Sequence, residues 1–221
     1  MKYKTILFDL DGTLNASEEG ITKSMQAALS ALGIHEEISS LSHFIGPPLN
    51  LELAATYDMS TEDIHRCISI FRARYETVGY KEAHLYPGIR ELLETLSQKG
   101  ARLAIASSKP HETLLCVAEH FGLTPYFCDI RGSRVEDEME NRTGADNKAG
   151  VIRNVLSRLE NVTLSETVMV GDSRFDITGA AANNISSIAV TYGYGKEADL
   201  IAARPTHIAR SVKELQSILL S

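Results

Sequence analysis

Cysteine is scarce in this chain of 221 residues, which contains Cys67, Cys116 and Cys128 alone. The number is odd, the spacings are wide and no Cys-x-x-Cys pair occurs, so neither a disulfide framework nor a zinc site is expected. We expect the three thiols to be free and buried, as is usual in a reducing cytosol.

Long apolar runs are missing as well. No stretch approaches the roughly 18 apolar residues of a membrane span. The apolar segment near the start is short and is soon interrupted by Asp9 and Asp11, which does not fit the core of a signal peptide. Internal repeats, low-complexity tracts and Pro/Gly/Ser-rich linkers are not seen either. These features predict a cytoplasmic protein with no membrane partner.

Positive charge is in deficit, and the formal net charge is -7. An acidic surface repels polyanions, so a nucleic acid polymer is not an expected partner. A phosphorylated ligand would have to be held locally, by a metal ion, a lysine or backbone N–H groups. The hydrophobic fraction of 43% and the length predict a folded chain of one large domain, or of one domain carrying a smaller one.

Short apolar strands alternate with amphipathic helices through most of the sequence, which predicts an α/β fold. This pattern indicates a doubly wound parallel sheet with helices on both faces. Between residues 18 and 81 only helical periodicity is present, which indicates an inserted all-helical block. Strands are predicted at 4–8, 102–106, 126–130, 167–170, 187–190 and 206–209, and helices at 89–98, 110–120, 149–159, 177–183 and after 211. Residues 131–144 are predicted to form a loop.

Polar side chains follow three of these strands. In an open parallel sheet, ligands bind beyond the carboxyl ends of the strands, so such side chains are candidates for a common site. The candidates are Asp9 and Asp11, then Ser107, Ser108 and Lys109, then Asp172, Ser173 and Asp176.

Asp9 and Asp11 are suited to two roles in attack on a phosphate ester. A carboxylate that attacks a phosphate anion needs a cation to offset the repulsion, and Mg²⁺ prefers oxygen ligands such as those of Asp9 and Asp172. Asp9 would then be the nucleophile, and Asp11 would protonate the leaving alcohol and later activate water. The alternative is that Asp9–Gly12 is only a solvated turn.

The remaining candidates also have plain structural interpretations. Ser107 or Ser108 could bind a phosphoryl oxygen, or could cap the helix that follows Pro110. Lys148 could pair with the nucleophile and phosphate, or could be a surface lysine, and the same holds for Lys109. Asp172 and Asp176 could also serve only as partners of a helix dipole.

Taken together, these residues resemble four motifs of the haloacid dehalogenase superfamily, in its phosphoglycolate-phosphatase-like or 5′-nucleotidase-like branch. Phe8–Leu14 is similar to the first motif, and Ser107–Lys109 to the second, although Ser108 stands where asparagine is common. Lys148 is similar to the third, and Gly171–Asp176 to the fourth. The segment 191–195 is similar to the stretch that follows the fourth motif, so the resemblance covers nearly the whole chain.

The resemblance implies a Rossmann-like catalytic core, residues 1–15 and 84–221, with a helical cap, residues 16–83. It implies Mg²⁺ as the cofactor. The implied site residues are the catalytic Asp9, Asp11, Ser107 and Lys148, the substrate-binding Thr13, Ser108, Lys109 and Gly46, the metal ligands Asp9, Asp172 and the Asp11 carbonyl, and the metal-supporting Asp176 and Ser173.

The function that the resemblance implies is hydrolysis of a small phosphorylated metabolite, such as phosphoglycolate or a nucleoside monophosphate, through an aspartyl-phosphate. Asp11 disfavours dehalogenation, which needs no acid at that position. One alternative is a sugar-phosphate mutase of the β-phosphoglucomutase type, although Thr13 favours hydrolysis. Another is a catalytically silent binding module, which the retention of all the catalytic residue types disfavours. The sequence does not indicate the oligomeric state.

Overall fold

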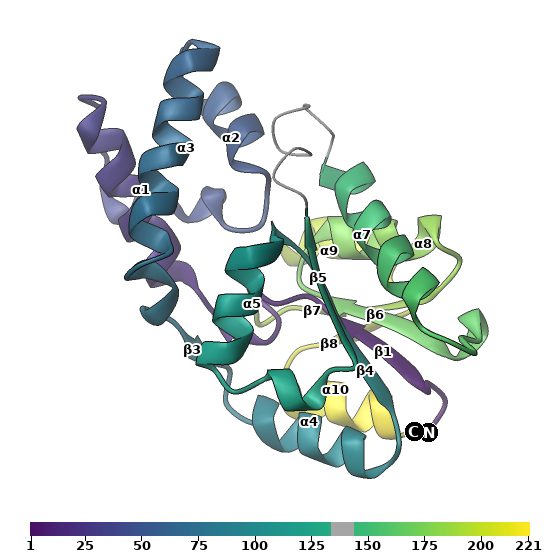
Figure 1. The fold of residues 1–221 in the computed structure, drawn as a ribbon. Helices are drawn as coiled ribbons and strands as arrows, with labels where there is room; N and C mark the ends of the chain where they lie inside the picture. Colours follow the sequence, from purple (N-terminus) through teal and green to yellow (C-terminus); the bar gives the residue numbers. More distant parts are fainter. Residues whose placement is uncertain (134–143) are drawn as a thin grey trace.

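The computed structural model describes the backbone of residues 1–133 and 144–221 and the side chains of residues 1–133 and 148–221. Six strands form one parallel sheet in the order β5-β4-β1-β6-β7-β8 (Figure 1). The strands are β1 (Thr5–Phe8), β4 (Arg102–Pro110), β5 (Asp129–Ser133), β6 (Thr167–Gly171), β7 (Ser186–Val190) and β8 (His207–Ala209). The predicted doubly wound parallel sheet is confirmed.

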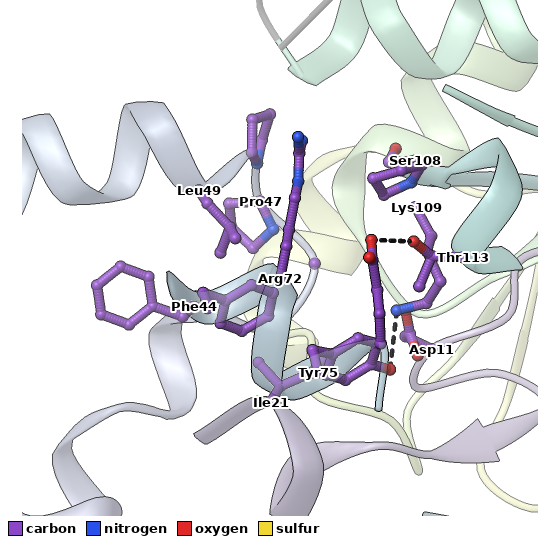
Figure 2. Close-up of a pocket in the computed structure, with 15 residues that line it drawn as sticks. Asp11, Ile21, Phe44, Pro47, Leu49, Arg72, Tyr75, Ser108, Lys109 and Thr113 are labelled. Atoms are coloured by element: carbon purple, nitrogen blue, oxygen red, sulfur yellow. Dashed lines mark hydrogen bonds and ion pairs between the residues drawn. The ribbon is translucent and has the colours of Figure 1, made fainter. Parts of the chain in front are cut away.

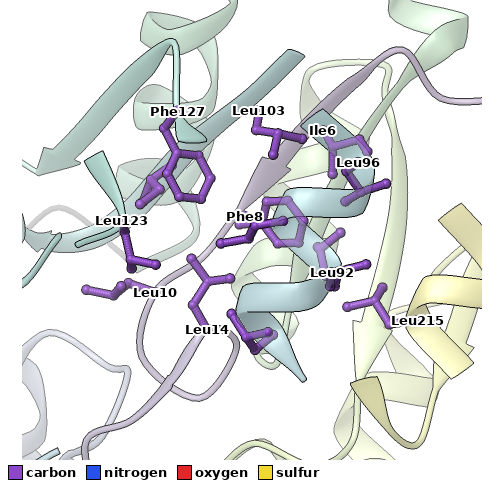
Figure 3. Close-up of a cluster of buried hydrophobic side chains, with 14 of the residues drawn as sticks. Ile6, Phe8, Leu10, Leu14, Leu92, Leu96, Leu103, Leu123, Phe127 and Leu215 are labelled. Atoms are coloured by element: carbon purple, nitrogen blue, oxygen red, sulfur yellow. The ribbon is translucent and has the colours of Figure 1, made fainter. Parts of the chain in front are cut away.

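The central strand β1 is apolar throughout because both of its faces are covered. Phe8 and Ile6 point into a cluster formed with α4 (Ile89–Gln98), α5 (His111–His120) and α10 (Val212–Leu220), part of which Figure 3 shows. Leu7 points the other way, into a cluster with α7 (Gly144–Arg158) and α8 (Arg174–Ala182). Successive side chains of a strand alternate between faces, so one four-residue strand joins both layers of the core.

A helical unit is inserted between β1 and α4, and we call it the cap. It comprises α1 (Glu18–Ala31), α2 (Leu49–Thr56), α3 (Thr61–Tyr75) and the short 3-10 helices η1 (Ile38–Ser40), η2 (Ser42–Phe44) and η3 (Gly79–Lys81). The cap has its own apolar cluster, which includes Met25, Leu53 and Phe71. Both of its ends pass through a two-stranded antiparallel ladder, formed by β2 (Asn15–Ala16) and β3 (His84–Leu85).

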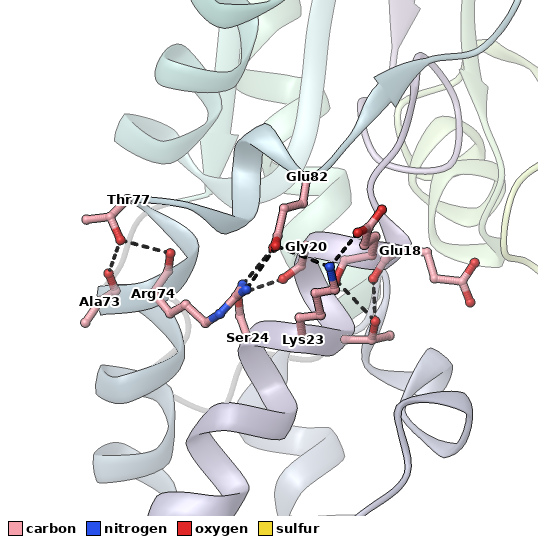
Figure 4. A network of polar contacts seen from close by, with 10 residues as sticks. Glu18, Gly20, Lys23, Ser24, Ala73, Arg74, Thr77 and Glu82 are labelled. Carbon is pink, nitrogen blue, oxygen red and sulfur yellow. Dashed lines mark hydrogen bonds and ion pairs between the residues drawn. The ribbon is translucent and has the colours of Figure 1, made fainter.

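A polar network ties the returning end of the cap to its first helix (Figure 4). The Arg74 guanidinium contacts the Glu82 carboxylate at 2.8 Å and donates to the Ser24 hydroxyl at 3.0 Å. Lys23 Nζ lies 3.4 Å from the same Glu82 carboxylate. The Ser24 hydroxyl in turn donates to the Gly20 carbonyl at 2.6 Å. The network therefore holds α1, α3 and the segment before β3 together.

A β-carbon at Gly20 is expected to destabilise the cap. It would lie 1.9 Å from the carbonyl oxygen of Gly79, so α1 and η3 would have to separate. Gly20→Ala should lower the free energy of unfolding by about 1–3 kcal/mol in urea denaturation. Gly150→Ala is the matched control, since its β-carbon meets nothing within 4 Å and alanine favours a helix by about 1 kcal/mol. Equal stability of the two variants would contradict the close packing.

Several sequence predictions need correction. The strand predicted at 126–130 lies at Asp129–Ser133, because Thr124–Tyr126 forms a 3-10 helix, η4, around Pro125. Residues 131–133 therefore belong to a strand and residue 144 to α7, while the rest of the predicted loop lies outside the described residues. Cys116 and Cys128 are exposed, not buried, although all three thiols are free as expected.

Short elements escaped prediction. They include α9 (Glu197–Ala202), η5 (Leu164–Glu166) and the ladder of β2 and β3. Strand β4 also runs on to Pro110, beyond the predicted end at 106. Among the helices of the described part of the chain, none is long and apolar enough to cross a membrane.

Candidate active site

Lys148 lies at the centre of a buried ionic cluster. Its Nζ is 3.1 Å from Asp9 Oδ2 and 2.8 Å from Asp176 Oδ1, and it donates to the Ala106 carbonyl at 2.9 Å. Only 1% of Lys148 is exposed, so the surface-lysine interpretation is wrong. Three elements that are far apart in sequence therefore place charged groups at one point beyond the strand ends.

The fold places Asp9 directly. Phe8 is aligned with Ile105 of β4 and with Val170 of β6, and the Asp9 N–H continues the ladder by donating to the Val170 carbonyl at 2.9 Å. Asp9 is therefore the first residue beyond β1, between the two neighbouring strands. Its Oδ1 accepts from the Leu10 N–H at 2.7 Å, which fixes the carboxylate. The solvated-turn interpretation does not hold, because Asp9 is buried.

Three buried carboxylates lie close enough to share a cation. One oxygen each from Asp9, Asp172 and Asp176 lies within 4.8 Å of the others. With Lys148 as their buried cationic partner, three ionised carboxylates leave two uncompensated negative charges, which a divalent cation would neutralise. Carboxylate oxygens are the ligands that Mg²⁺ prefers, so the donor set fits this ion.

The pKa values of the cluster reflect burial first and this excess of negative charge second. Burial, together with the Asp176 and Asp11 charges, raises the pKa of Asp9 to about 6 against the opposing effect of Lys148. Burial and the charges of Asp176 and Asp9 raise the pKa of Asp172 well above its usual value. Burial alone would lower the pKa of Lys148, but Asp176 and Asp9 outweigh it and raise that pKa, so this lysine stays charged.

Asp172 is held by closely approaching backbone. The Tyr194 N–H donates to its Oδ2 at 2.8 Å. A β-carbon would lie 2.0 Å from this oxygen at Gly12 and 2.5 Å from it at Gly193. Gly12 also has a φ of +75°, a left-handed conformation that glycine adopts without strain. These two glycines therefore form a cradle that only residues without a side chain can provide.

Asp176 and Ser173 together begin α8. The Ser173 hydroxyl and N–H donate to Asp176 Oδ2 at 2.7 and 3.0 Å, and the Asp176 N–H donates back to the hydroxyl at 3.4 Å, which forms a capping box. The other oxygen of Asp176 pairs with Lys148. Asp176 thus has a structural role at the helix start and also orients Lys148, whereas Asp172 lies before the helix and faces Asp9.

Asp11 is paired with a second lysine, whose side chain is 7% exposed and reaches the cap. Lys109 Nζ lies 2.9 Å from Asp11 Oδ2, donates to the Tyr75 hydroxyl at 3.0 Å, and sits 4.4 Å from the centre of the Tyr75 ring (Figure 2). Burial alone would lower the pKa of Lys109, but Asp11 and Tyr75 raise it by more than burial lowers it. This lysine is therefore also charged. Lys109 therefore joins the core to α3.

The other predicted residues are dispersed around this centre. Ser107 is 2% exposed, and its hydroxyl accepts from the Lys109 N–H at 3.2 Å. Neither serine caps α5, since Pro110 holds that position, so the capping interpretation is wrong. Ser108 and Gly46 line the pocket described next, while the Thr13 side chain is fully buried outside that lining.

A pocket lies between the cap and the core (Figure 2). Asp11 is at its core end, and most of its remaining lining comes from the cap. Its lining residues are Asp11, Ile21, Phe44, Gly46, Pro47, Pro48, Leu49, Phe71, Arg72, Tyr75, Glu76, Ser108, Lys109, Pro110 and Thr113.

Three residues outside the predicted site also join the cap to the core. The Tyr75 hydroxyl accepts from Lys109, as described above. The Glu76 carboxylate accepts from the Thr113 hydroxyl at 3.1 Å. The Tyr194 hydroxyl accepts from the Glu18 N–H at 3.0 Å. Tyr194 lies in the segment 191–195 singled out above, which was the available signal. Tyr75 and Glu76 carried no such signal.

Comparison with known proteins identifies the family. The profile described as haloacid dehalogenase-like hydrolase matches residues 6–190. A Pseudomonas aeruginosa protein named 5′-nucleotidase is 38% identical over 220 residues, 99% of this chain and 96% of that protein. The Mycobacterium tuberculosis protein named tyrosine-protein kinase PtkA is 34% identical over 218 residues, which are 97% of this chain and 72% of that protein.

Solved structures agree. The crystal structure of a predicted phosphatase from Clostridium acetobutylicum superimposes with a TM-score of 0.89 at 38% identity, covering 99% of this chain and 98% of that one. The match of the profile, the relatives and the fold extends over Asp9, Lys148 and Asp172. This chain is therefore a member of the haloacid dehalogenase-like hydrolase family.

Proposed function

We propose that this protein is a Mg²⁺-dependent phosphomonoesterase that acts on a small phosphorylated metabolite through an aspartyl-phosphate on Asp9. The observation that carries the proposal is the Asp9 carboxylate, buried between Lys148 and two further acids, with Asp11 two residues away. The relative named 5′-nucleotidase and the structure titled a predicted phosphatase support the same reaction class.

The proposed chemistry has two displacements. An oxygen of Asp9 attacks phosphorus, and the P–O bond to the leaving alcohol breaks. The alcohol oxygen that leaves takes a proton from Asp11. In the second displacement Asp11 removes a proton from water, which attacks the same phosphorus. The acyl-phosphate bond then breaks, phosphate leaves and Asp9 is regenerated. Lys148 stays charged throughout and offsets negative charge at Asp9.

The metal site that we propose consists of Asp9, Asp172 and the Asp11 carbonyl, with support from Asp176 and Ser173. When bound, Mg²⁺ would offset the repulsion between the Asp9 carboxylate and the phosphate anion. We propose that Ser107, near the carboxyl end of β4, binds a phosphoryl oxygen together with Lys148. We propose Ser108, Lys109 and Gly46 as substrate-side residues because they line the pocket.

The proposal is tested by phosphate release from sugar phosphates, nucleoside monophosphates and phosphoglycolate, with Mg²⁺ and then with a chelator. We expect release from at least one compound, loss with the chelator, and one phosphate freed for each ester consumed. Ester consumption without free phosphate would contradict hydrolysis. It would favour transfer to another acceptor, as in a mutase or as the name of the relative PtkA implies for that protein.

Mg²⁺ affinity is expected to increase with pH. The metal-free protein holds a proton on Asp9 below its pKa of about 6, and burial also raises the pKa of Asp172. Mg²⁺ must displace such protons, so its apparent dissociation constant should fall by about tenfold per pH unit for each of the two carboxyls that still holds a proton, and should level off once both are ionised. Titration calorimetry in buffers of different ionisation enthalpy would detect the released protons. A pH-independent constant with no proton release would contradict this.

A further inference from the structure

The pocket between cap and core holds the leaving group if Asp11 is the acid, and this step rests on the proposed function. Asp11 lies at the core end of the pocket, 2.9 Å from Lys109, which also lines it. A proton donated by Asp11 goes to the bridging oxygen of the ester. The group attached to that oxygen must therefore extend from Asp11 toward the cap.

The lining of the pocket is mainly apolar and rigid. It contains the side chains of Ile21, Phe44, Leu49 and Phe71 and three prolines. The Phe71 ring is stacked on the Tyr75 ring with centroids 5.4 Å apart. The loop from Gly46 to Pro48 is preformed, since Gly46 has a φ of +100° and two prolines follow it. Such a surface favours a ligand with an apolar face, because burying that face removes it from water.

The charges of the lining are balanced. Among the described residues that line the pocket, the cations Lys109 and Arg72 are matched by the acids Asp11 and Glu76. Lys109 is already in contact with Asp11, and the Glu76 carboxylate accepts from Thr113. A leaving group with its own carboxylate or second phosphate would find no excess of positive charge here, and its burial would be costly.

We infer that the substrate is a monophosphate ester whose leaving group is uncharged and carries a ring with an apolar face. A nucleoside and an arylalkyl alcohol share this chemistry. Phosphoglycolate, with its carboxylate, and sugar bisphosphates, with their second phosphate, do not. Leu49, on the cap wall opposite the core, is a specificity-determining residue in this assignment (Figure 2).

The test compares ring-bearing esters, whose leaving group carries an aromatic ring or a nucleobase, with ring-free esters, whose leaving group carries neither. The kcat/KM for phosphate release is measured for adenosine and uridine 5′-monophosphates against ribose 5-phosphate, and for benzyl phosphate against glycerol 3-phosphate and phosphoglycolate, all with Mg²⁺. We expect at least one ring-bearing class to exceed its ring-free counterpart by about tenfold or more. Preference for the nucleotides alone would identify a nucleoside, and preference for benzyl phosphate an arylalkyl group. Equal or faster release from the ring-free or carboxylate-bearing esters would overturn the inference.

A variant tests whether the pocket is the cause. Leu49→Asn places an amide of similar size in the apolar wall and should reduce the ratio of ring-bearing to ring-free kcat/KM by about fivefold or more, mainly through KM. Ile38→Asn is the control, because Ile38 is an exposed apolar residue of the cap outside the lining. An unchanged ratio in Leu49→Asn would overturn the assignment.

The two levels of proposal fail differently. Phosphate release from ring-free esters alone would leave the phosphomonoesterase intact and contradict only the substrate class. Failure of every ester, with folded protein and Mg²⁺ present, would contradict the proposed function and with it this inference.

Discussion

Replacing Asp9 with asparagine is expected to reduce phosphate release by at least about 10³-fold and to leave the protein folded. An amide cannot form the acyl-phosphate, so the first displacement is lost and not merely slowed. Asparagine also lacks the carboxylate whose pKa burial raises, so Asp9→Asn should be at least as stable as the wild type without metal near neutral pH. The comparison is made on the best ester from the panel, with thermal unfolding in parallel.

The control and a direct readout make this result specific. Asp58→Asn changes an exposed aspartate of the cap and should alter neither activity nor stability measurably. Rapid acid quench and mass spectrometry should detect a phosphorylated peptide containing Asp9 in the wild type and none in Asp9→Asn. Activity of Asp9→Asn within about tenfold of wild type would indicate direct attack by water instead.

Replacing Lys148 with methionine should have the largest effect on stability. The change keeps a long side chain but leaves Asp9 and Asp176 without the cation now 3.1 and 2.8 Å away. Removing one partner of a buried ion pair costs about 3–5 kcal/mol, and urea denaturation of the metal-free protein at pH 7 should show this loss. Lys213→Met, at an exposed position of α10, is the control and should change stability by less than about 0.5 kcal/mol.

The pH dependence of this loss follows from the raised pKa of Asp9. A carboxyl whose pKa is higher in the folded state than in the unfolded state favours folding as pH falls, because the folded state binds the extra proton. Acidification from about pH 7 to 5 should therefore narrow the gap between Lys148→Met and wild type, since protonated carboxyls need no cation. A gap that stays constant or widens would show that the lysine stabilises the fold by packing alone.

Much of the arrangement around Asp9 could be predicted because it follows from strand ends. Asp9 and Asp172 each come directly after a short apolar strand, and parallel strands end at the same edge of the sheet. Lys148 was harder, since a lysine before an apolar helix is common, and only the resemblance selected it. No comparable rule predicts the contacts between cap and core. Tyr75 and Lys109 are far apart in the sequence and meet only through tertiary packing, which local periodicity does not encode.

The errors in the fold have the same physical origin. The composition of residues 126–130 predicts a strand, but Pro125 stabilises a 3-10 turn and shifts the hydrogen-bonded ladder to Asp129–Ser133. The six-residue helix Glu197–Ala202 is too short to show a clear period. The pairing of Asn15–Ala16 with His84–Leu85 joins segments almost seventy residues apart, so no local sequence pattern predicts it.

That pairing of β2 with β3 has a consequence for how such a protein can be altered. Asn15 is aligned with Leu85 and Ala16 with His84, so the chain leaves the sheet and comes back to it at neighbouring points. The helices between them form a unit attached to the core through this ladder, and among the described residues Tyr80 is the one cap residue that packs against the main apolar clusters of the sheet. Caps of different size could be attached at this ladder without changing the register of the parallel sheet. Diversity of substrates and constancy of chemistry can therefore be encoded in separate parts of one chain.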